Sequence, residues 1–477
     1  MKRKATIKPA ARRAETPISI DLSNLPACVE DVRRAALDSD SGPADPTSYS
    51  ALRGRLEASR EKLPPLYREV VFQPYARALE RLGAAGFASV LASDPERISG
   101  AGLMLDVAQA ILQNGEGYQE RPTDAFQEVV SDLYDGFLSA EDRRGVERPD
   151  HGTVPPLVKW GNPDSGPYTW PVDATEVLGV GAGVVSLPPS HARRGLFAWG
   201  ALGHETAGHD VLGADTGLRG ELEDAVRNAL LDSNVGEDLA EYWAERIDET
   251  ASDVLGILNM GPGAALGLLG YFRGLSAAFE GRAKLRSDGP ADDSHPADVL
   301  RGYLAASTVR LLRFDRAAAW GKILEAETDK DVGSIVLAGA EVGAETARRS
   351  AAAVAEAIVK TRARSLEHRS LGRIQNWRNR DEEIVAELRT VLAGPGEPPS
   401  EVEAGFYAAH AVTAALTAAA STGGDIRRLH ERLVLVLKGM HDRNPSWGPL
   451  FVRRPGDLRP RFAYGRIRAR ERELARV

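Results

Sequence analysis

The stretch GALGHETAGHDVLG, at residues 200–213, brings together three side chains that could do chemistry: His204, Glu205 and His209. Neutral imidazoles are common ligands of zinc, and a carboxylate beside them can take a proton from a water molecule. These residue types therefore predict a metal site with an adjacent general base.

The spacing of the two histidines sets a condition on the backbone. The zinc-peptidase signature His-Glu-x-x-His separates its histidines by four residues, whereas here they are five apart. On a regular α-helix, residues four apart lie about 40° apart around the axis, and residues five apart lie about 140° apart. A one-residue π-bulge returns both rings to one face, and Gly208 lies where a helix deforms most easily. We therefore predict a deformed helix here; on a regular helix the two histidines would face different ways.

A second segment, EYWAERIDETASDVLGIL, supplies two carboxylates. Glu249 and Asp253 lie four residues apart in a helical pattern that also carries the apolar residues Trp243, Ile247 and Val254, so this helix has a buried face. Two imidazoles and one carboxylate hold zinc and leave its fourth position open for water. Glu249 is the candidate third ligand, and Asp253 is the candidate partner that fixes the tautomer of a ligand histidine. The alternative for both is a solvated helix face.

A third segment, DDSHPADVLRGYLAA, contains His295 and Arg301. Ser294 or His295 is expected to cap a helix that has Pro296 at its first position, which places His295 at a rigid helix entrance. From there His295 could stabilise an oxyanion, and Arg301 could steady a carboxylate or the substrate. A histidine that caps a helix beside a proline can equally be structural.

Together the three segments resemble the gluzincin clan of zinc metallopeptidases. HETAGH is similar to the His-Glu-x-x-Gly-His motif of dipeptidyl peptidase III, and ETASD resembles the Glu-x-x-x-Asp of gluzincins. SHPADVLR resembles the His-Pro-x-x-x-x-Arg element of the prenyl-protein-protease and heat-shock membrane protease group. The resemblance covers about residues 175–310. It departs from dipeptidyl peptidase III at Asp248, where that family has a glutamate, and its His-Pro element belongs to a group whose members often span the membrane.

The resemblance implies a zinc metallopeptidase, a hydrolase that acts on a peptide or protein substrate with Zn²⁺ as its cofactor. Carried over residue by residue, the implied site comprises the zinc ligands His204, His209 and Glu249, the general base Glu205, the supporting carboxylate Asp253, the transition-state histidine His295 and its partner Arg301. The substrate, the choice between exopeptidase and endopeptidase, and the family within the clan stay open.

The elements that must position this site are expected to be mainly helical. We expect a mainly α (α+β) fold with a zincin-like catalytic core, in which a small sheet precedes the active-site helix and helical lobes flank the core. Residues 147–190 are rich in Pro, Gly and Trp, and Val177–Leu187 is the best strand candidate. By the resemblance, this segment is an edge strand that pairs with the substrate backbone; the alternative is a buried strand.

The length of 477 residues predicts more than one domain. We expect a disordered N-terminal tail at 1–45, with a short helix near 27–37, and a helical N-terminal domain at 46–150. The zincin-like catalytic domain is expected at 151–330 and a helical C-terminal domain at 331–477.

Composition limits the partners and the compartment. The net charge of -8 argues against nucleic acid as a partner, because binding it usually needs a basic face. The single cysteine, Cys28, excludes an intramolecular disulfide and indicates a reducing compartment, so we expect a cytoplasmic protein. Two uncharged runs, Val254–Phe272 and Phe406–Gly424, suit buried helices better than membrane spans. The oligomeric state is not readable from the sequence.

Other classes of function stay open. The pair His209-Asp210 resembles HD-type metal phosphohydrolases, an interpretation that leaves Glu205 and Glu249 without a role. Under it, Asp210→Asn abolishes activity, whereas under the peptidase interpretation Glu205→Gln does so. The chain could also be a helical interaction protein with an inactive or structural metal site and a functional surface in 335–477, or a zinc-dependent regulator that holds a partner without cleaving it.

Overall fold

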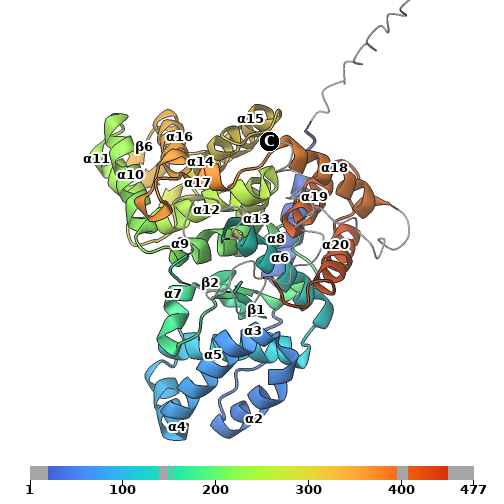
Figure 1. Ribbon diagram of the computed structural model, residues 1–477. Coiled ribbons are helices and arrows are strands. Elements are labelled where there is room, and N and C mark those ends of the chain that lie inside the picture. The colour runs from blue at the N-terminus through green and yellow to red at the C-terminus, as the bar shows by residue number, and fades with distance from the viewer. Residues whose placement is uncertain (1–19, 139–148, 152–153, 395–406, 449–477) are drawn as a thin grey trace, which may run out of the picture.

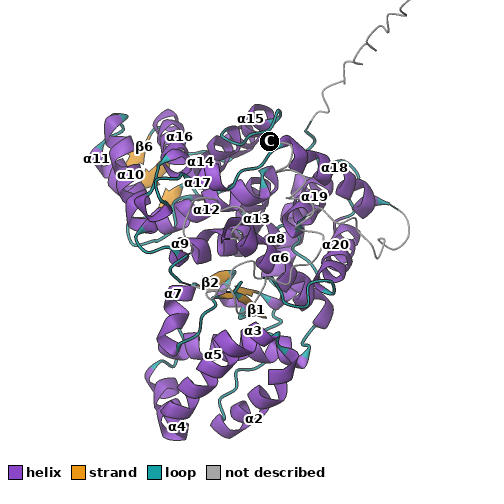
Figure 2. Ribbon diagram, viewed as in Figure 1, coloured by secondary structure: helices purple, strands orange, loops and turns teal. Residues whose placement is uncertain are grey.

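The computed structural model describes residues 20–138, 149–151, 154–394 and 407–448. Within these ranges the protein is mostly helical, with two small three-stranded sheets (Figure 2). The expected fold class, mainly α with a small β component, is therefore confirmed.

The helices that precede the first sheet in the chain lie in two different parts of the molecule. They are α1 (Leu25–Ala36), α2 (Tyr49–Ser59), η1 (Arg60–Lys62), α3 (Pro65–Tyr67), η2 (Arg68–Phe72), α4 (Gln73–Ser93), α5 (Gly100–Glu116) and α6 (Glu120–Leu138). Helices α2, α4 and α5 lie together at the lower end of the view in Figure 1, around an apolar core of their own that includes Leu52 and Tyr75.

Helix α1 packs instead against the upper part of the molecule, on α13 (Pro262–Phe279). Its apolar face is buried, with Val32 fully inaccessible. The short helix predicted near 27–37 is confirmed as α1. The disordered tail predicted for 1–45 is wrong from residue 20 onward, because this amphipathic face has a partner; residues 1–19 lie outside the described residues.

The first sheet corrects the predicted strand. It has the order β1-β3-β2, with β1 (Leu157–Trp160) parallel and β2 (Tyr168–Trp170) antiparallel to β3 (Val184–Leu187). The predicted strand at Val177–Leu187 thus begins only at Val184, and Val177 lies in a short 3₁₀ helix, η4 (Glu176–Leu178). All four residues of β3 are buried, as expected for a strand with a neighbour on each side. The expectation of an edge strand here is wrong: β3 is central, and β2 is an edge.

The helices from the first sheet to α13 include the two that carry the ligand-type residues, η6 and α12. They are η3 (Pro163–Ser165) and α7 (Val172–Thr175) within the sheet region, then η5 (Pro189–Ala192), α8 (Ala198–Leu202), η6 (Gly203–Asp210), α9 (Val211–Ala214), α10 (Leu218–Asp232), α11 (Glu237–Ala244), α12 (Ile247–Met260) and α13. The uncharged run Val254–Phe272 is divided between α12 and α13 at Gly261, whose φ of 61° ends the helix. Among the described residues, no helix combines the length and the apolar composition that a membrane span requires.

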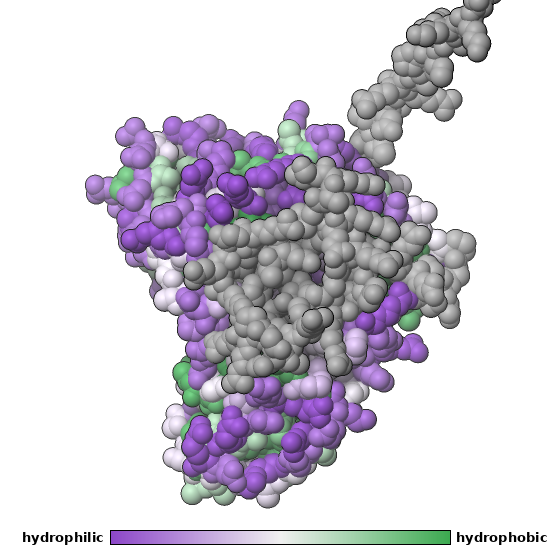
Figure 3. Space-filling model, in the orientation of Figure 1, coloured by the Kyte–Doolittle hydropathy of each residue, from purple (hydrophilic) through white to green (hydrophobic). Residues whose placement is uncertain are grey.

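The remaining elements enclose this centre. They are β4 (Asp288–Gly289), α14 (Asp298–Arg310), α15 (Ala317–Asp329), β5 (Ile335–Leu337), β6 (Ala340–Val342), α16 (Ala344–Lys360), η7 (Arg364–Leu366), α17 (Leu371–Ile374), α18 (Asn379–Ala393), α19 (Ala408–Ala420) and α20 (Ile426–His441). One apolar core runs from α1 through α12 and α13 to α20, so the described residues show no division of the core near residue 330. On the face shown in Figure 3, hydrophilic side chains predominate over the described parts, with small apolar patches between them.

Candidate metal centre

The HETAGH segment lies in η6, which is a π-helix between α8 and α9. Hydrogen bonds in a π-helix join residues five apart, so His204 and His209 fall on one face. Their Nε2 atoms are 3.0 Å apart, and their rings are almost perpendicular, at 88°. The helix deformation that the five-residue spacing requires is therefore present.

Small residues let η6 lie unusually close to α12. A Cβ atom added at Gly208 would lie 2.4 Å from Cβ of Ser252, and one added at Gly256 would lie 2.8 Å from the carbonyl carbon of Gly203. Both distances are far below the ordinary contact distance of about 3.5 Å between carbon atoms. Side chains at these positions would therefore push the helices apart, and their absence brings Glu249 of α12 within reach of the histidines.

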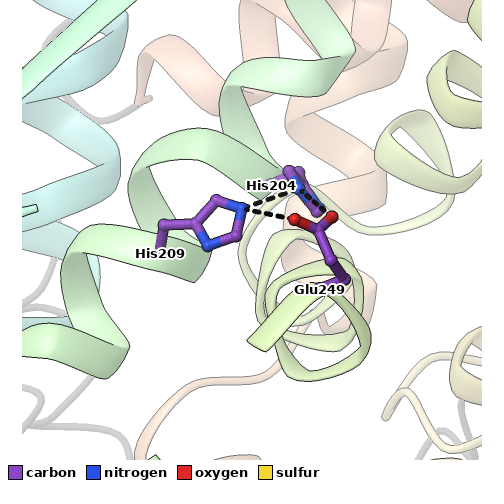
Figure 4. Close-up of side chains that lie close together, drawn as sticks. All are labelled: His204, His209 and Glu249. Carbon is purple, nitrogen blue, oxygen red and sulfur yellow. Dashed lines mark hydrogen bonds and ion pairs between the residues drawn. The ribbon is translucent and has the colours of Figure 1, made fainter. Parts of the chain in front are cut away.

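Three ligand-type side chains converge from these two helices (Figure 4). Nε2 of His204 lies 3.2 Å from Oε2 of Glu249, and Nε2 of His209 lies 3.5 Å from Oε1 of the same carboxylate. One ligand atom from each residue lies within 4.8 Å of the other two, so this group could hold a metal ion. The structure brings together the three residues that the sequence predicts as ligands.

The chemistry of the group fits a shared cation. Oε2 of Glu249 is buried, and although Nε2 of His204 lies 3.2 Å away, the two atoms do not form a well-directed hydrogen bond. Burial opposes protonation of His204, but the carboxylates of Asp253 and Glu249 outweigh it and raise the pKa of His204 to about 10. Burial would raise the pKa of Glu249, but the neighbouring charge of His204 holds it well below its usual value. The protein thus concentrates negative potential where the two imidazoles meet.

A buried carboxylate supports the first histidine from behind. Nδ1 of His204 donates to Oδ1 of Asp253 at 2.8 Å, which leaves Nε2 directed at Glu249 and His209. Arg301 on α14 clamps the same carboxylate, with Nε and Nη2 each 2.8 Å from an oxygen of Asp253. Burial would raise the pKa of Asp253, but the charge and hydrogen bonds of Arg301 lower it, so Asp253 is an anion.

Asp248 plays a similar part for the second histidine, although it is not among the site residues predicted from the sequence. Its Oδ2 lies 3.3 Å from Nδ1 of His209, and its Oδ1 lies 3.7 Å from Arg219. The signal was present in the sequence, because Asp248 precedes Glu249 in the first turn of the same helix. Each ligand histidine therefore has a carboxylate on its outer nitrogen, an arrangement that orients metal-binding imidazoles.

Glu205 faces a cavity beside the ligand group. The cavity, of about 370 Å³, is also lined by His204, Glu249 and His295. Glu205 is 5% exposed, and its Oε2 accepts a hydrogen bond of 2.8 Å from Oγ1 of Thr169 on the edge strand β2. No motif in the sequence marks Thr169, because the contact joins two segments that are distant along the chain.

His295 lies at the rim of this cavity, but not in the local structure that the sequence predicts. Helix α14 begins at Asp298 with Ala297 as its N-cap residue, so the predicted cap by Ser294 or His295 is wrong. The turn is instead fixed by Asp293, whose Oδ1 accepts the backbone N–H of His295 at 2.9 Å. The imidazole is half exposed, with Nε2 3.4 Å from Oε1 of Glu249. The contacts of Arg301 are with Asp253, His204 and Glu249.

Asp210 points away from the ligand group. Its Oδ1 accepts the backbone N–H of Val172 at 3.1 Å, on the side of η6 that faces the first sheet. The carboxyl group is fully buried, and burial raises its pKa to about 8. Asp210 therefore supports the junction between η6 and α7.

Comparison of the chain with protein-family models, with curated proteins and with solved structures finds no match. Any function therefore has to be inferred from the site itself.

Proposed function

We propose that the protein is a zinc-dependent peptidase of the gluzincin type that works in the cytoplasm. The observation that carries the proposal is the convergence of His204, His209 and Glu249 beside the buried carboxylate of Glu205 in one cavity. The two imidazole Nε2 atoms lie 3.0 Å apart, and they lie 3.2 and 3.5 Å from different oxygens of the Glu249 carboxylate. One ligand atom from each residue lies within 4.8 Å of the other two, and two imidazoles with one carboxylate are a donor set that suits zinc.

When bound, zinc supplies a Lewis acid and makes a water molecule at its open position more acidic. Glu205 accepts the proton of the attacking water and returns it to the amine that leaves, and Thr169 orients its carboxylate. His295 also lines the cavity, where its imidazole can donate a hydrogen bond to the oxyanion of the tetrahedral intermediate. Asp253 and Asp248 keep the two ligand imidazoles in their tautomers.

Glu205 favours a catalytic centre over a structural one. A structural zinc site is closed by four protein ligands, whereas the group in the described residues offers three. A purely structural site also has no use for a buried carboxylate that faces a cavity next to the ligands.

The test is metal content followed by activity. Protein purified without added metal is analysed by mass spectrometry as the wild type and as His209→Ala and Glu249→Ala. We expect about one zinc per chain in the wild type and a large loss in both variants. The zinc-loaded wild type should then cleave members of a mixed peptide library, and Glu205→Gln should keep its zinc but not cleave. A wild type that binds no zinc when zinc is supplied, or a Glu205→Gln variant with full activity, would overturn the proposal.

A further inference from the structure

Helix α13 presents an apolar stripe to the cavity of the metal centre. Leu268, Phe272, Leu275 and Phe279 recur every three or four residues, so they share one face of the helix, and all four line the cavity. Phe272 and Leu275 are only partly buried, and Phe279 is 68% exposed. Large apolar side chains left open to water beside a reactive group are a mark of a binding surface.

Helix α13 packs against α8 and α1 through a row of glycines on another face. A Cβ at Gly270 would lie 2.2 Å from Phe197, and one at Gly274 would lie 2.4 Å from Val32 of α1. A Cβ at Gly267 would lie 3.0 Å from Cα of Gly200 in α8. The glycine face of α13 is thus used for packing, whereas Phe272, Leu275 and above all Phe279 keep part of their surface open to the cavity.

The cavity is also lined by Arg286, Asp298 and Glu280, whose charges are already paired. Arg286 forms ion pairs with Asp293 and Asp298, and Glu280 pairs with Arg282 at 3.0 Å. A charged substrate side chain would have to compete with these partners, whereas an apolar one needs only to displace water from the stripe. The volume of about 370 Å³ lies at the small end of the range for ligand pockets, which suits one or two side chains.

We infer that the stripe on α13 is the subsite for a large apolar side chain next to the bond that is cleaved, so that the substrates are peptides with leucine-like or phenylalanine-like residues at that position. The inference rests on the proposed peptidase function. Leu275 and Phe279 are its specificity residues. The ring of Phe272 also stacks on the guanidinium of Arg301 at 4.5 Å. A substitution at Phe272 would therefore disturb Arg301 as well as the subsite.

The experiment measures peptide binding without turnover. Zinc-loaded Glu205→Gln protein is titrated by calorimetry with four capped tetrapeptides that share their outer residues and have Leu-Leu, Gly-Gly, Asp-Asp or Lys-Lys at the centre. We expect the Leu-Leu peptide to bind at least about tenfold more tightly than the other three, as burial of leucine side chains requires. Leu275→Asp should abolish this preference, and Phe279→Ala, at an exposed position that cannot disturb the fold, should reduce it. The control is Leu435→Asp on α20, at an exposed leucine outside the cavity, which should keep the preference.

The outcomes separate this inference from the proposed function. Equal binding of the four peptides, binding of none, or a preference that survives in both Leu275→Asp and Phe279→Ala would overturn the subsite. Selective binding of the Leu-Leu peptide without its cleavage by the zinc-loaded wild type would support the subsite and reject the peptidase. Cleavage of all four peptides at similar rates would support the peptidase and reject the subsite.

Discussion

Oδ1 of Asp253 lies 2.8 Å from Nδ1 of His204, on the opposite side of the imidazole ring from the nitrogen that faces His209 and Glu249. The carboxylate is fully buried and is clamped by Arg301. One side chain therefore joins α12 to both η6 and α14, and it sets the direction in which the ligand nitrogen points.

The first prediction concerns this carboxylate. Asp253→Asn should weaken metal binding about 10- to 100-fold, because the imidazole loses the partner that fixes its tautomer. It should also lower the free energy of unfolding of the metal-free protein by about 2–3 kcal/mol, because the buried Arg301 loses a charged acceptor. Chelator competition and urea unfolding measure the two effects. The control Asp238→Asn, at an exposed position on α11, should change neither; an Asp253→Asn protein with wild-type metal affinity would contradict the assignment.

A second prediction concerns how strongly Asp248 supports metal binding by His209. Asp248→Asn should weaken metal binding by about tenfold, the low end of the range for such outer carboxylates, because Asp248 is partly exposed. Arg219→Ala should have little effect on the affinity, because its ion pair with Asp248 is solvent-exposed and such pairs contribute about 0–1 kcal/mol. The same chelator competition tests both variants, and an equal effect of the two would show that Asp248 acts only as a surface charge.

A third prediction concerns the close contact of η6 and α12. Gly208→Ala should destabilise the protein by about 1–3 kcal/mol and weaken metal binding, because the new methyl group overlaps Ser252. Gly220→Ala on α10 makes the same chemical change at a position with nothing within 4 Å, and it should stabilise the protein by about 1 kcal/mol. Thermal unfolding with and without zinc compares the pair. Similar effects of both substitutions would mean that the helices do not need this approach.

A fourth prediction follows from the hydrogen bond between Thr169 and Glu205. Thr169→Val keeps the shape of the side chain but removes the donor, so a Glu205 carboxylate that acts as general base is no longer oriented. We expect a fall in kcat of about 10-fold or more, with zinc content and KM unchanged. Thr169→Ser retains the hydroxyl and should restore most of the rate. An unchanged kcat in Thr169→Val would show that Thr169 of β2 does not position Glu205.

A fifth prediction is a loss of stability in mild acid that arises at His191. Burial lowers the pKa of this ring to about 4, whereas in the unfolded chain it is about 6.5, so the unfolded state binds the proton first as the pH falls. The free energy of unfolding should therefore decrease between about pH 6.5 and pH 4, by up to about 3 kcal/mol from this group. Urea unfolding of wild type and His191→Gln across this range isolates the effect, since other titrating groups are common to both. Parallel curves for the two proteins would contradict it.

The ligand group was predictable because its rules are local. The helical period places Glu249 and Asp253 on one face, and the five-residue spacing of His204 and His209 states what the backbone must do if both bind one ion. The relation of Arg301 to Asp253 instead depends on how α14 meets α12, which no spacing encodes. The same holds for Thr169, which reaches Glu205 from an edge strand.

The errors have a physical pattern as well. An apolar run such as Val177–Leu187 fits a central or an edge strand equally, and only its neighbours in space decide. The tail predicted at 1–45 is ordered from residue 20, because the short helix expected near 27–37 has an apolar face that α13 covers. The composition of a segment averages the polarity of all its residues, whereas the packing of a helix depends on a few apolar positions such as Val32.

The π-helix also makes the metal centre tolerant of a change in chain length. The histidines are separated by one residue more than in a four-residue spacing. In a regular helix, one extra residue would rotate everything after it by about 100° around the axis. Here Gly203–Asp210 absorbs the extra residue, and α8 and α9 continue on either side. The same arrangement of ligand-type side chains is therefore compatible with two chain lengths, so a single-residue insertion or deletion in this segment need not move the candidate metal site.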